Sequence, residues 1–152
     1  MLGELSAAQI EQLLRRQVTG RIACTDRETP YIVPVNYVYD GKRIVGHSTA
    51  GKKIEMMRKN PKVCFQVDEI KNIFNWQSVI AWGRFEEITD MEEKERAMQA
   101  LTHRIMPLAE NPADHASHGL SDNENDIGTK LELILYQVVL ISKTGRFEHP
   151  QS

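Results

Sequence analysis

The residues best suited to chemistry are a serine, a glycine and two adjacent lysines in the first half of the chain. Ser48 comes first, and Gly51, Lys52 and Lys53 follow at the start of a helix predicted over residues 51–60. The first N–H groups of a helix have no intrahelical partner, and the helix dipole places positive charge there. A helix start with two lysines and a nearby hydroxyl therefore favours a phosphate dianion. The alternative is a solvated helix face, which composition alone would favour.

A hairpin before that helix positions these residues. Residues 31–39 and 43–47 are rich in β-formers, and Asp40-Gly41 between them predicts a tight turn in which both central residues have positive φ. Because proline cannot donate to a β ladder, Pro34 predicts an edge, a bulge, or a bend where a ligand approaches. The second strand brings His47 close to the helix start. A lone strand histidine is more often structural than chemical, so both interpretations stay open.

The rest of the chain predicts a mainly β fold of one domain, residues 1–152. We expect helices over 6–16 and from residue 89, strands over 21–25, 62–67, 77–88 and 131–142, a loop over 68–76, and a functional lid or mobile segment over 106–129. Many strands with few helices favour an antiparallel barrel over a parallel sheet.

Composition and charge narrow the class of ligand. Hydrophobic content of 41% and charged content of 26% are typical of a globular protein. The longest apolar run, residues 131–141, is interrupted by polar side chains, and no secretory signal is visible, so we expect a cytoplasmic protein with no membrane span. The net charge is −2, yet residues 42–62 carry seven Lys or Arg against Glu55 alone. A local basic patch in an acidic chain suits a small anionic ligand better than nucleic acid.

Other kinds of chemistry are disfavoured. Asp114, His115 and His118 have a spacing that suits a metal, but no second cluster completes a tetrahedral site, so we expect no metal. Cys24 and Cys64 lie in apolar strand-like runs and predict buried thiols without a chemical role. The sequence lacks a Ser-His-Asp arrangement, a nucleophile elbow, a Walker loop and a dinucleotide fingerprint, which disfavours hydrolases and kinases.

Six ordered motifs resemble those of a known family. They are Gly20-Arg21-Ile22-Ala23, Pro30-Tyr31-Ile32-Val33-Pro34-Val35-Asn36-Tyr37, Gly46-His47-Ser48, Gly51-Lys52-Lys53-Ile54-Glu55-Met56, Asn60-Pro61-Lys62-Val63-Cys64-Phe65 and Val79-Ile80-Ala81-Trp82-Gly83-Arg84. In this order the motifs resemble the split-barrel flavin-binding family related to pyridoxamine-phosphate oxidase, and within it the 5-nitroimidazole-resistance (Nim-type) branch. The resemblance implies an antiparallel split β-barrel with peripheral helices.

The resemblance also implies a cofactor, FMN, and the residues that hold it. In that family a basic pair ahead of an Asn-Pro grips the FMN phosphate, and Lys52-Lys53 ahead of Asn60-Pro61 matches this arrangement. Lys52 stands where the family oxidase has arginine, so it supplies charge without a bidentate fork. The other implied cofactor-binding residues are Val33, Pro34, Val35 and Asn36 along the flavin edge, Ser48 near the phosphate, and His47 and Ser78 at the ring, with His47 as the catalytic proton donor.

The implied function is flavin-dependent redox chemistry in a homodimer whose two chains share the flavin site. A reduced nicotinamide or another donor would supply electrons, and a small oxidant such as a nitroimidazole or another nitroaromatic would accept them. Two alternatives remain. A haem-binding or haem-degrading relative would use the same barrel, with ligands among His103, His115 and His118. A flavin carrier or sensor would bind the cofactor without turnover.

Overall fold

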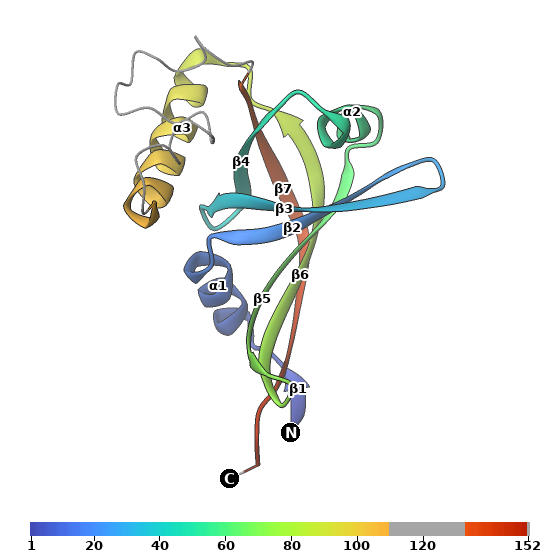
Figure 1. Cartoon of the computed structure of the whole chain (residues 1–152), viewed down its shortest axis with the longest axis vertical. Helices are drawn as coiled ribbons and strands as arrows, with labels where there is room; N and C mark the ends of the chain where they lie inside the picture. Colours follow the sequence, from blue (N-terminus) through green and yellow to red (C-terminus); the bar gives the residue numbers. More distant parts are fainter. Residues whose placement is uncertain (110–132, 152) are drawn as a thin grey trace.

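The computed structural model describes residues 1–109 and 133–151 of the chain (Figure 1). In chain order its elements are β1 (Leu2–Glu4), α1 (Ala7–Arg16), β2 (Thr19–Asp26), β3 (Thr29–Tyr39), β4 (Arg43–Thr49), α2 (Lys52–Lys59), β5 (Lys62–Asn72), β6 (Asn75–Glu87), α3 (Met91–Ile105), the 3₁₀ turn η1 (Met106–Leu108) and β7 (Leu133–Glu148). No helix of this described part is long and apolar enough to cross a membrane.

The strands form one antiparallel sheet that closes on itself. Their order is β1-β7-β4-β3-β2-β5-β6, and β7 also pairs with β6. Two junctions are short, because β3 pairs with β4, and β2 with β5, through three residue pairs each. The β2–β3 hairpin therefore leaves the sheet beside α2 (Figure 1). This architecture confirms the predicted mainly β, antiparallel split barrel with peripheral helices.

Alternating side chains give the barrel an apolar inner face. Ile22, Phe65, Val67, Val79 and Ala81 come from β2, β5 and β6, and each is no more than 1% exposed. The first helix begins as predicted with a capping box between Ser6 and Gln9, and its leucines 13 and 14 complete this core. Helix α2 adds Ile54, Met56 and Met57. Helices α1 and α2 therefore pack with the barrel strands into one continuous core.

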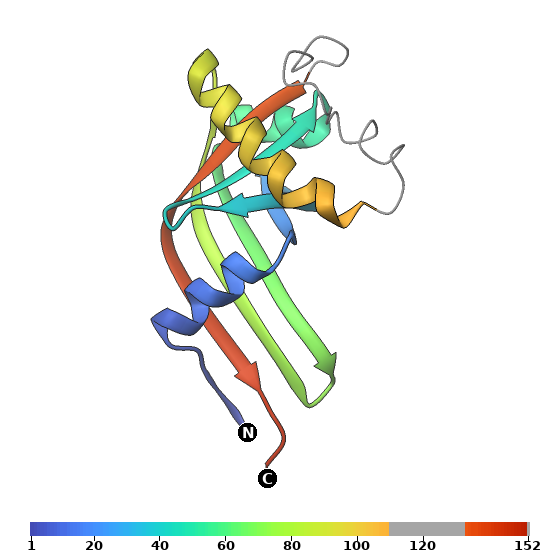
Figure 2. The same ribbon diagram turned by 90° about the vertical axis from the view of Figure 1, so that its left-hand side faces the viewer.

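Helix α3 packs on the other, outer face of the sheet. Its residues Met98 and Leu101 lie in a second cluster with Val45 of β4 and Leu135 of β7. The helix predicted from residue 89 is confirmed, with Asp90 as its N-cap and Met91 as its first residue. Figure 2 shows α1 and α3 on the same side of the molecule, in front of the strands. One part of the outer face is therefore covered by α3, beside the strands β3 and β4.

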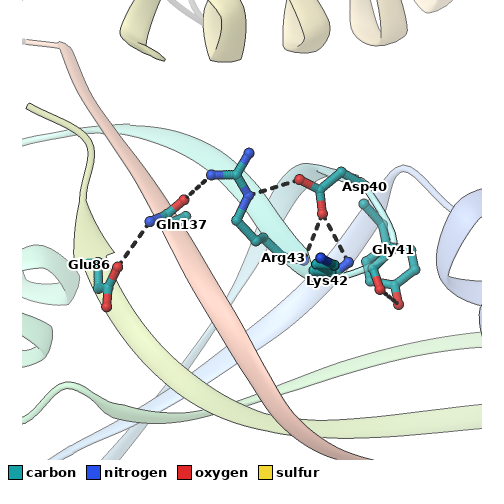
Figure 3. A network of polar contacts seen from close by, with 7 residues as sticks. Asp40, Gly41, Lys42, Arg43, Glu86 and Gln137 are labelled. Carbon is teal, nitrogen blue, oxygen red and sulfur yellow. Dashed lines mark hydrogen bonds and ion pairs between the residues drawn. The ribbon is translucent and has the colours of Figure 1, made fainter. Parts of the chain in front are cut away.

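The predicted tight turn at Asp40-Gly41 is wrong in its detail. The loop has three residues, 40–42, and only Gly41 has positive φ, at 97°. Asp40 keeps an ordinary conformation because its carboxylate accepts hydrogen bonds from the backbone N–H groups of Lys42 and Arg43. The Arg43 side chain then binds Asp40 and Gln137, and Gln137 donates to Glu86 (Figure 3). This network ties the hairpin to β7 and β6 and holds their register.

Three strand boundaries also differ from those predicted. The expected loop over 68–76 is mostly β structure, since β5 runs to Asn72 and β6 begins at Asn75. β7 continues to Glu148 instead of ending near residue 142, and β1 was not expected. Gly145 does not end the last strand; a Cβ there would lie 2.9 Å from Leu5 and Ile10, so glycine makes room for the chain end and α1. Most of the predicted lid over 106–129 lies outside the described residues.

Candidate functional site

The N-terminal part of β3 has a strand on one side only. Residues 29–36 pair with β2, and β4 joins β3 only at residues 37–39. Within the described ranges, the backbone of Val33, Pro34 and Val35 therefore has no strand along its second edge. Pro34 fits this place, since it has no N–H to donate. Of the three arrangements that Pro34 predicts, the structure shows the edge; the bend at a ligand stays a prediction.

Several residues assigned to the flavin share the outer face of the sheet. Register places Pro34 opposite Arg21 of β2, and Asn36 opposite Thr19, whose hydroxyl donates to the Asn36 carboxamide at 2.9 Å. Ser78 of β6 lies on the same face, two strands further on. Val33 and Val35 alternate with these residues, and their side chains pack into the inner core. These two valines can thus contribute only their backbone to the predicted flavin edge.

His47 lies on the same outer face, at the border of α3. It pairs with Leu135 and alternates with Val45, and both of these residues belong to the α3 cluster. Both of its ring nitrogens are buried. A histidine in this position can act on a ligand that lies along the open edge of β3, and it can also serve the packing beneath α3. The structure places it where both interpretations of the sequence expected it.

The start of α2 provides the second part of the site. Gly51 is the N-cap, no side chain caps the helix, and a Cβ at Gly51 would meet nothing within 4 Å. The Lys52 ammonium lies 5.1 Å from the centre of the Tyr31 ring, and the Lys53 ammonium lies 6.0 Å from that of Tyr136. Neither lysine forms an ion pair within residues 1–109 and 133–151. Two cations thus stand at an open helix start, and no carboxylate of the described residues pairs with them.

The environment of Lys53 is partly apolar, and among the residues that the structure describes no carboxylate forms an ion pair with it. Burial lowers the pKa of its ammonium, and the nearby Cys24 raises that pKa by a smaller amount. The Tyr136 hydroxyl is completely buried and has no hydrogen-bond partner in the described part of the chain. An ideal Cβ on Gly46 would lie 2.6 Å from this hydroxyl, so glycine is required there. An ammonium that burial destabilises gains most from a bound anion.

Ser48 and Asn60 play local structural roles. The Ser48 hydroxyl donates to the carbonyl of Thr49 at 2.8 Å, which directs it along its own strand. The Asn60 side chain donates to the Thr25 hydroxyl at 2.9 Å and ties the end of α2 to β2. Asn60 also ends the helix ahead of Pro61, so the Asn-Pro that marks the motif fixes the position of α2 relative to the barrel.

The structure adds residues that the sequence interpretation missed. Ser78 accepts a hydrogen bond from Gln66, which also donates to Asp68 and accepts from Arg21. Tyr31 and Tyr136 are the aromatic neighbours of the two lysines. Arg21 could have been noticed as a cation in a strand that otherwise alternates small and apolar residues. The approach of Tyr136 to α2 depends on closure of the sheet, which the sequence does not reveal.

The chain was compared with known families and proteins. Residues 6–125 match the family described as pyridoxamine 5'-phosphate oxidase. An uncharacterized protein of Rhizobium meliloti is 43% identical over 69 residues, which are 45% of this chain and 46% of that protein. The matched part thus spans about half of that curated relative.

Solved structures share the whole fold. A FAD-binding protein of Mesorhizobium loti has a TM-score of 0.73 and 27% identity, covering 97% of this chain and 98% of its own. A candidate 5-nitroimidazole antibiotic resistance protein of Bacteroides thetaiotaomicron has a TM-score of 0.73 and 22% identity, covering 97% and 87%. A FAD- and haem-binding protein of Mycobacterium smegmatis has a TM-score of 0.72 and 15% identity, covering 99% and 76%.

The fold defines the class of protein as an antiparallel split barrel. Because the family match covers most of the sequence, this chain belongs to the pyridoxamine 5'-phosphate oxidase family. The predicted family is therefore confirmed. One of the solved structures that share the fold is the candidate 5-nitroimidazole resistance protein described above.

Proposed function

We propose that this protein binds FMN and works as an oxidoreductase, passing electrons from a reduced nicotinamide to a small oxidant such as a nitroimidazole. One observation carries the proposal: in a chain of this family, two lysines stand at the open start of α2, near the free edge of β3, and neither forms an ion pair with a carboxylate of the described residues. A phosphate dianion supplies the missing counter-charge, and a flat ring system suits an unpaired strand edge. A reaction that draws on a reduced nicotinamide pool belongs in the cytoplasm.

The residues present fit a flavin mononucleotide. Lys52 and Lys53 would hold its phosphate, with Ser48 close by. The β3 backbone from Val33 to Asn36 would line the ring. When bound, a flavin accepts a hydride and returns electrons to an oxidant. The proposal names FMN rather than the FAD of the Mesorhizobium loti protein, because a pair of lysines at one helix start suits a single terminal phosphate.

His47 would act on the reaction. Its buried ring nitrogens lie on the face of the sheet that carries Asn36 and Ser78. A histidine there can hold or donate a proton while negative charge develops on the ring. The α3 cluster on one side of it keeps water away. This role makes His47 the proposed catalytic residue, while Asn36 and Ser78 are proposed to orient the ring.

The shared site of a homodimer is part of the same proposal. The outer face of β5 and β6 has no described helix packed on it, and it carries the exposed Trp82. Ile32 of β3 and Val139 and Ile141 of β7, on or beside this face, are 62%, 36% and 79% exposed. Large apolar side chains that remain exposed on one face favour a protein partner. A second copy on this face would cover the free edge of β3 and enclose the ring.

Two other functions remain candidates. The haem alternative is supported by the fold that this chain shares with the FAD- and haem-binding protein of Mycobacterium smegmatis. Of the three histidines proposed as its ligands, His103 lies exposed on α3, and His115 and His118 lie outside the described residues. A non-catalytic flavin carrier is the other candidate. An absorption spectrum separates haem from flavin, and turnover with NADH or NADPH and a nitroimidazole separates the carrier from the enzyme.

The test is a titration of the purified protein with FMN and with FAD, compared with the double variant Lys52→Ala, Lys53→Ala. We expect the double variant to bind FMN about 3 kcal/mol more weakly, which is more than a hundredfold. The matched control is Lys59→Ala, Lys62→Ala, since these exposed lysines also flank α2 but lie away from its start. Equal binding of FMN by the parent and the lysine variant would overturn the phosphate site. An intense Soret band would favour haem.

A further inference from the structure

A hydrogen-bonded network crosses the outer face between two segments assigned to the flavin. The Arg21 guanidinium donates to the Gln66 carboxamide oxygen and to the Asp68 carboxylate, both at 3.2 Å. The Gln66 amide nitrogen then donates to Asp68 at 3.0 Å and to the Ser78 hydroxyl at 3.1 Å. Both hydrogens of this amide are used, and its oxygen accepts from Arg21. The network thus has a defined direction from Arg21 to Ser78.

Register places this network next to the open edge of β3. Arg21 lies directly opposite Pro34 in the β2–β3 pair, and opposite Gln66 in the β2–β5 pair. Directly opposed side chains on one face lie about 5 Å apart at Cβ. Pro34 and Ser78, which are 44 positions apart in the sequence, are therefore joined by Arg21 and Gln66 on one face of four adjacent strands.

The network orients one donor and presents one cation. The Ser78 hydroxyl accepts from Gln66, and within the described residues its own hydrogen has no acceptor, so it remains available to a ligand. The Arg21 side chain is 52% exposed and that of Asp68 is 23% exposed. The guanidinium is thus more accessible than the carboxylate that partly neutralises it. An arginine keeps its charge at every physiological pH.

We propose that Arg21, held by Asp68 and Gln66, sets the reduction potential of the bound flavin, with Ser78 oriented as a hydrogen-bond donor to the ring. This inference rests on the proposed function and deepens it. Two-electron reduction with uptake of one proton leaves net negative charge on a flavin ring. A nearby cation stabilises that charge, and a nearby carboxylate opposes it. Arg21 thus raises the potential, and Asp68 moderates the effect.

The experiment measures the midpoint potential of the flavin-loaded protein by equilibrium titration with a redox dye, together with FMN affinity and thermal unfolding. In Arg21→Gln we expect the midpoint potential of bound FMN to be about 30 mV lower than in the parent. This shift corresponds to a loss of about tenfold in the ratio of the affinities for reduced and oxidised FMN. Asp68→Asn should shift the potential in the opposite direction. Arg21→Lys, which keeps the charge, should recover most of the parental value. Ser78→Ala should lower the potential by a smaller amount.

The control is Arg96→Gln, which removes one arginine from the exposed surface of α3 without touching the network. It should leave the potential unchanged, and all variants should bind FMN and unfold cooperatively. Unchanged potentials in both Arg21→Gln and Asp68→Asn, with FMN still bound, would overturn this inference alone. Shifts of the same sign in these two variants would also overturn it. A parent protein that binds no flavin would overturn the proposed function, and this inference with it.

Discussion

At the scale of single residues, substitution of His47 distinguishes a role in FMN binding from a role in the reaction. Its ring nitrogens are buried on the outer face of the sheet, where His47 pairs with Leu135, whereas the Lys53 ammonium lies over the ring of Tyr136, which belongs to the inner core. We therefore expect His47→Ala to keep FMN affinity within about threefold while reoxidation by a nitroimidazole slows at least tenfold, since proton donors contribute roughly 10²–10⁴ to rates. Anaerobic reduction followed by stopped-flow mixing with the oxidant measures this rate.

His47→Gln is the companion variant, because glutamine keeps hydrogen-bonding groups but does not titrate. A reduced rate in both variants supports a proton donor. If both reoxidise at the parental rate, and only thermal stability falls in His47→Ala, the histidine belongs to the packing beneath α3 and has no catalytic role. The reoxidation rates are compared per flavin bound, and absorbance measures the fraction of protein that carries flavin.

Lys53 makes a prediction about pH. Burial lowers the pKa of its ammonium in the free protein, so the charge is lost at a lower pH than the ordinary lysine pKa of about 10.4. A phosphate contact needs the protonated form. The affinity for FMN should therefore be highest near neutral pH and fall as the pH rises through the lowered pKa.

Riboflavin is the control for this measurement, because it has the same ring but no phosphate. The affinity for riboflavin should not depend on the protonation of Lys53. A loss of affinity with pH that both ligands share reports on the ring instead. Titrations of both ligands from pH 7 to pH 10, with the parent and with Lys53→Ala, isolate the lysine. A steep loss of FMN affinity that persists in Lys53→Ala would contradict the assignment.

The candidate site residues were named from the sequence, but their contacts could not be predicted. A pair of lysines at a helix start is a local pattern, so Lys52 and Lys53 were found before the fold was known. The orientation of Ser48 toward Thr49, and the network that joins Ser78 to Arg21, depend on side-chain contacts and strand register. Periodicity fixes which residues share a face of one strand, but not which strand lies next to it.

At the scale of elements, the contact between β4 and β7 supports a prediction of stability. An ideal Cβ at Gly46 would lie 2.6 Å from the Tyr136 ring and hydroxyl, and Tyr136 is fully buried. Gly46→Ala should therefore lower the free energy of unfolding by about 1–3 kcal/mol through overpacking. Gly51→Ala is the contrast, because its Cβ would meet nothing within 4 Å and the cost should be a few tenths of a kcal/mol.

Tyr136→Phe tests the same contact from the other side. The buried hydroxyl has no partner among the described residues, so its removal should leave the free energy of unfolding unchanged or raise it by about 1 kcal/mol. Urea denaturation of the flavin-free protein measures both variants. A large loss in Tyr136→Phe would show that the hydroxyl is satisfied in solution, and an unchanged Gly46→Ala would show that the barrel can shift there.

Elements were predicted well where local signals are strong. The capping box of α1 and the proline after α2 marked those helices within one residue of their ends. The β5–β6 hairpin was missed between residues 68 and 76 because its outer face is polar and its end exposes Ile73 and Phe74, as a loop would. Its strands are stabilised by pairing with each other over many residues, and this non-local effect has no signature in a short window.

At the scale of the whole molecule, closure of the sheet separates an inner face, packed within the chain, from an outer face that leaves large apolar side chains exposed. Strand β7 pairs with both β4 and β6 and completes the barrel, so the inner face is satisfied within one chain. The outer face carries the network around Arg21 and the exposed Trp82, and α3 packs on the part of it formed by β3, β4 and the start of β7. The barrel could be predicted from strand number and spacing. The exposed apolar side chains could not, because exposure depends on the complete packing.

The last prediction concerns this face. If two copies meet through it, light scattering should give twice the 17.4 kDa mass of one chain at micromolar concentration. Trp82→Glu places a charge at the proposed centre and should weaken dimerisation by about 2 kcal/mol or more, roughly thirtyfold, because buried aromatic anchors dominate such interfaces. FMN affinity should fall with the dimer, since the second copy completes the ring site. Met91→Glu, which replaces an apolar residue on α3 that is 67% exposed against 42% for Trp82, should change neither property. A flavin-bound monomer would show that one chain encloses the cofactor alone, and a Trp82→Glu protein that stays dimeric would show that this face is not the interface.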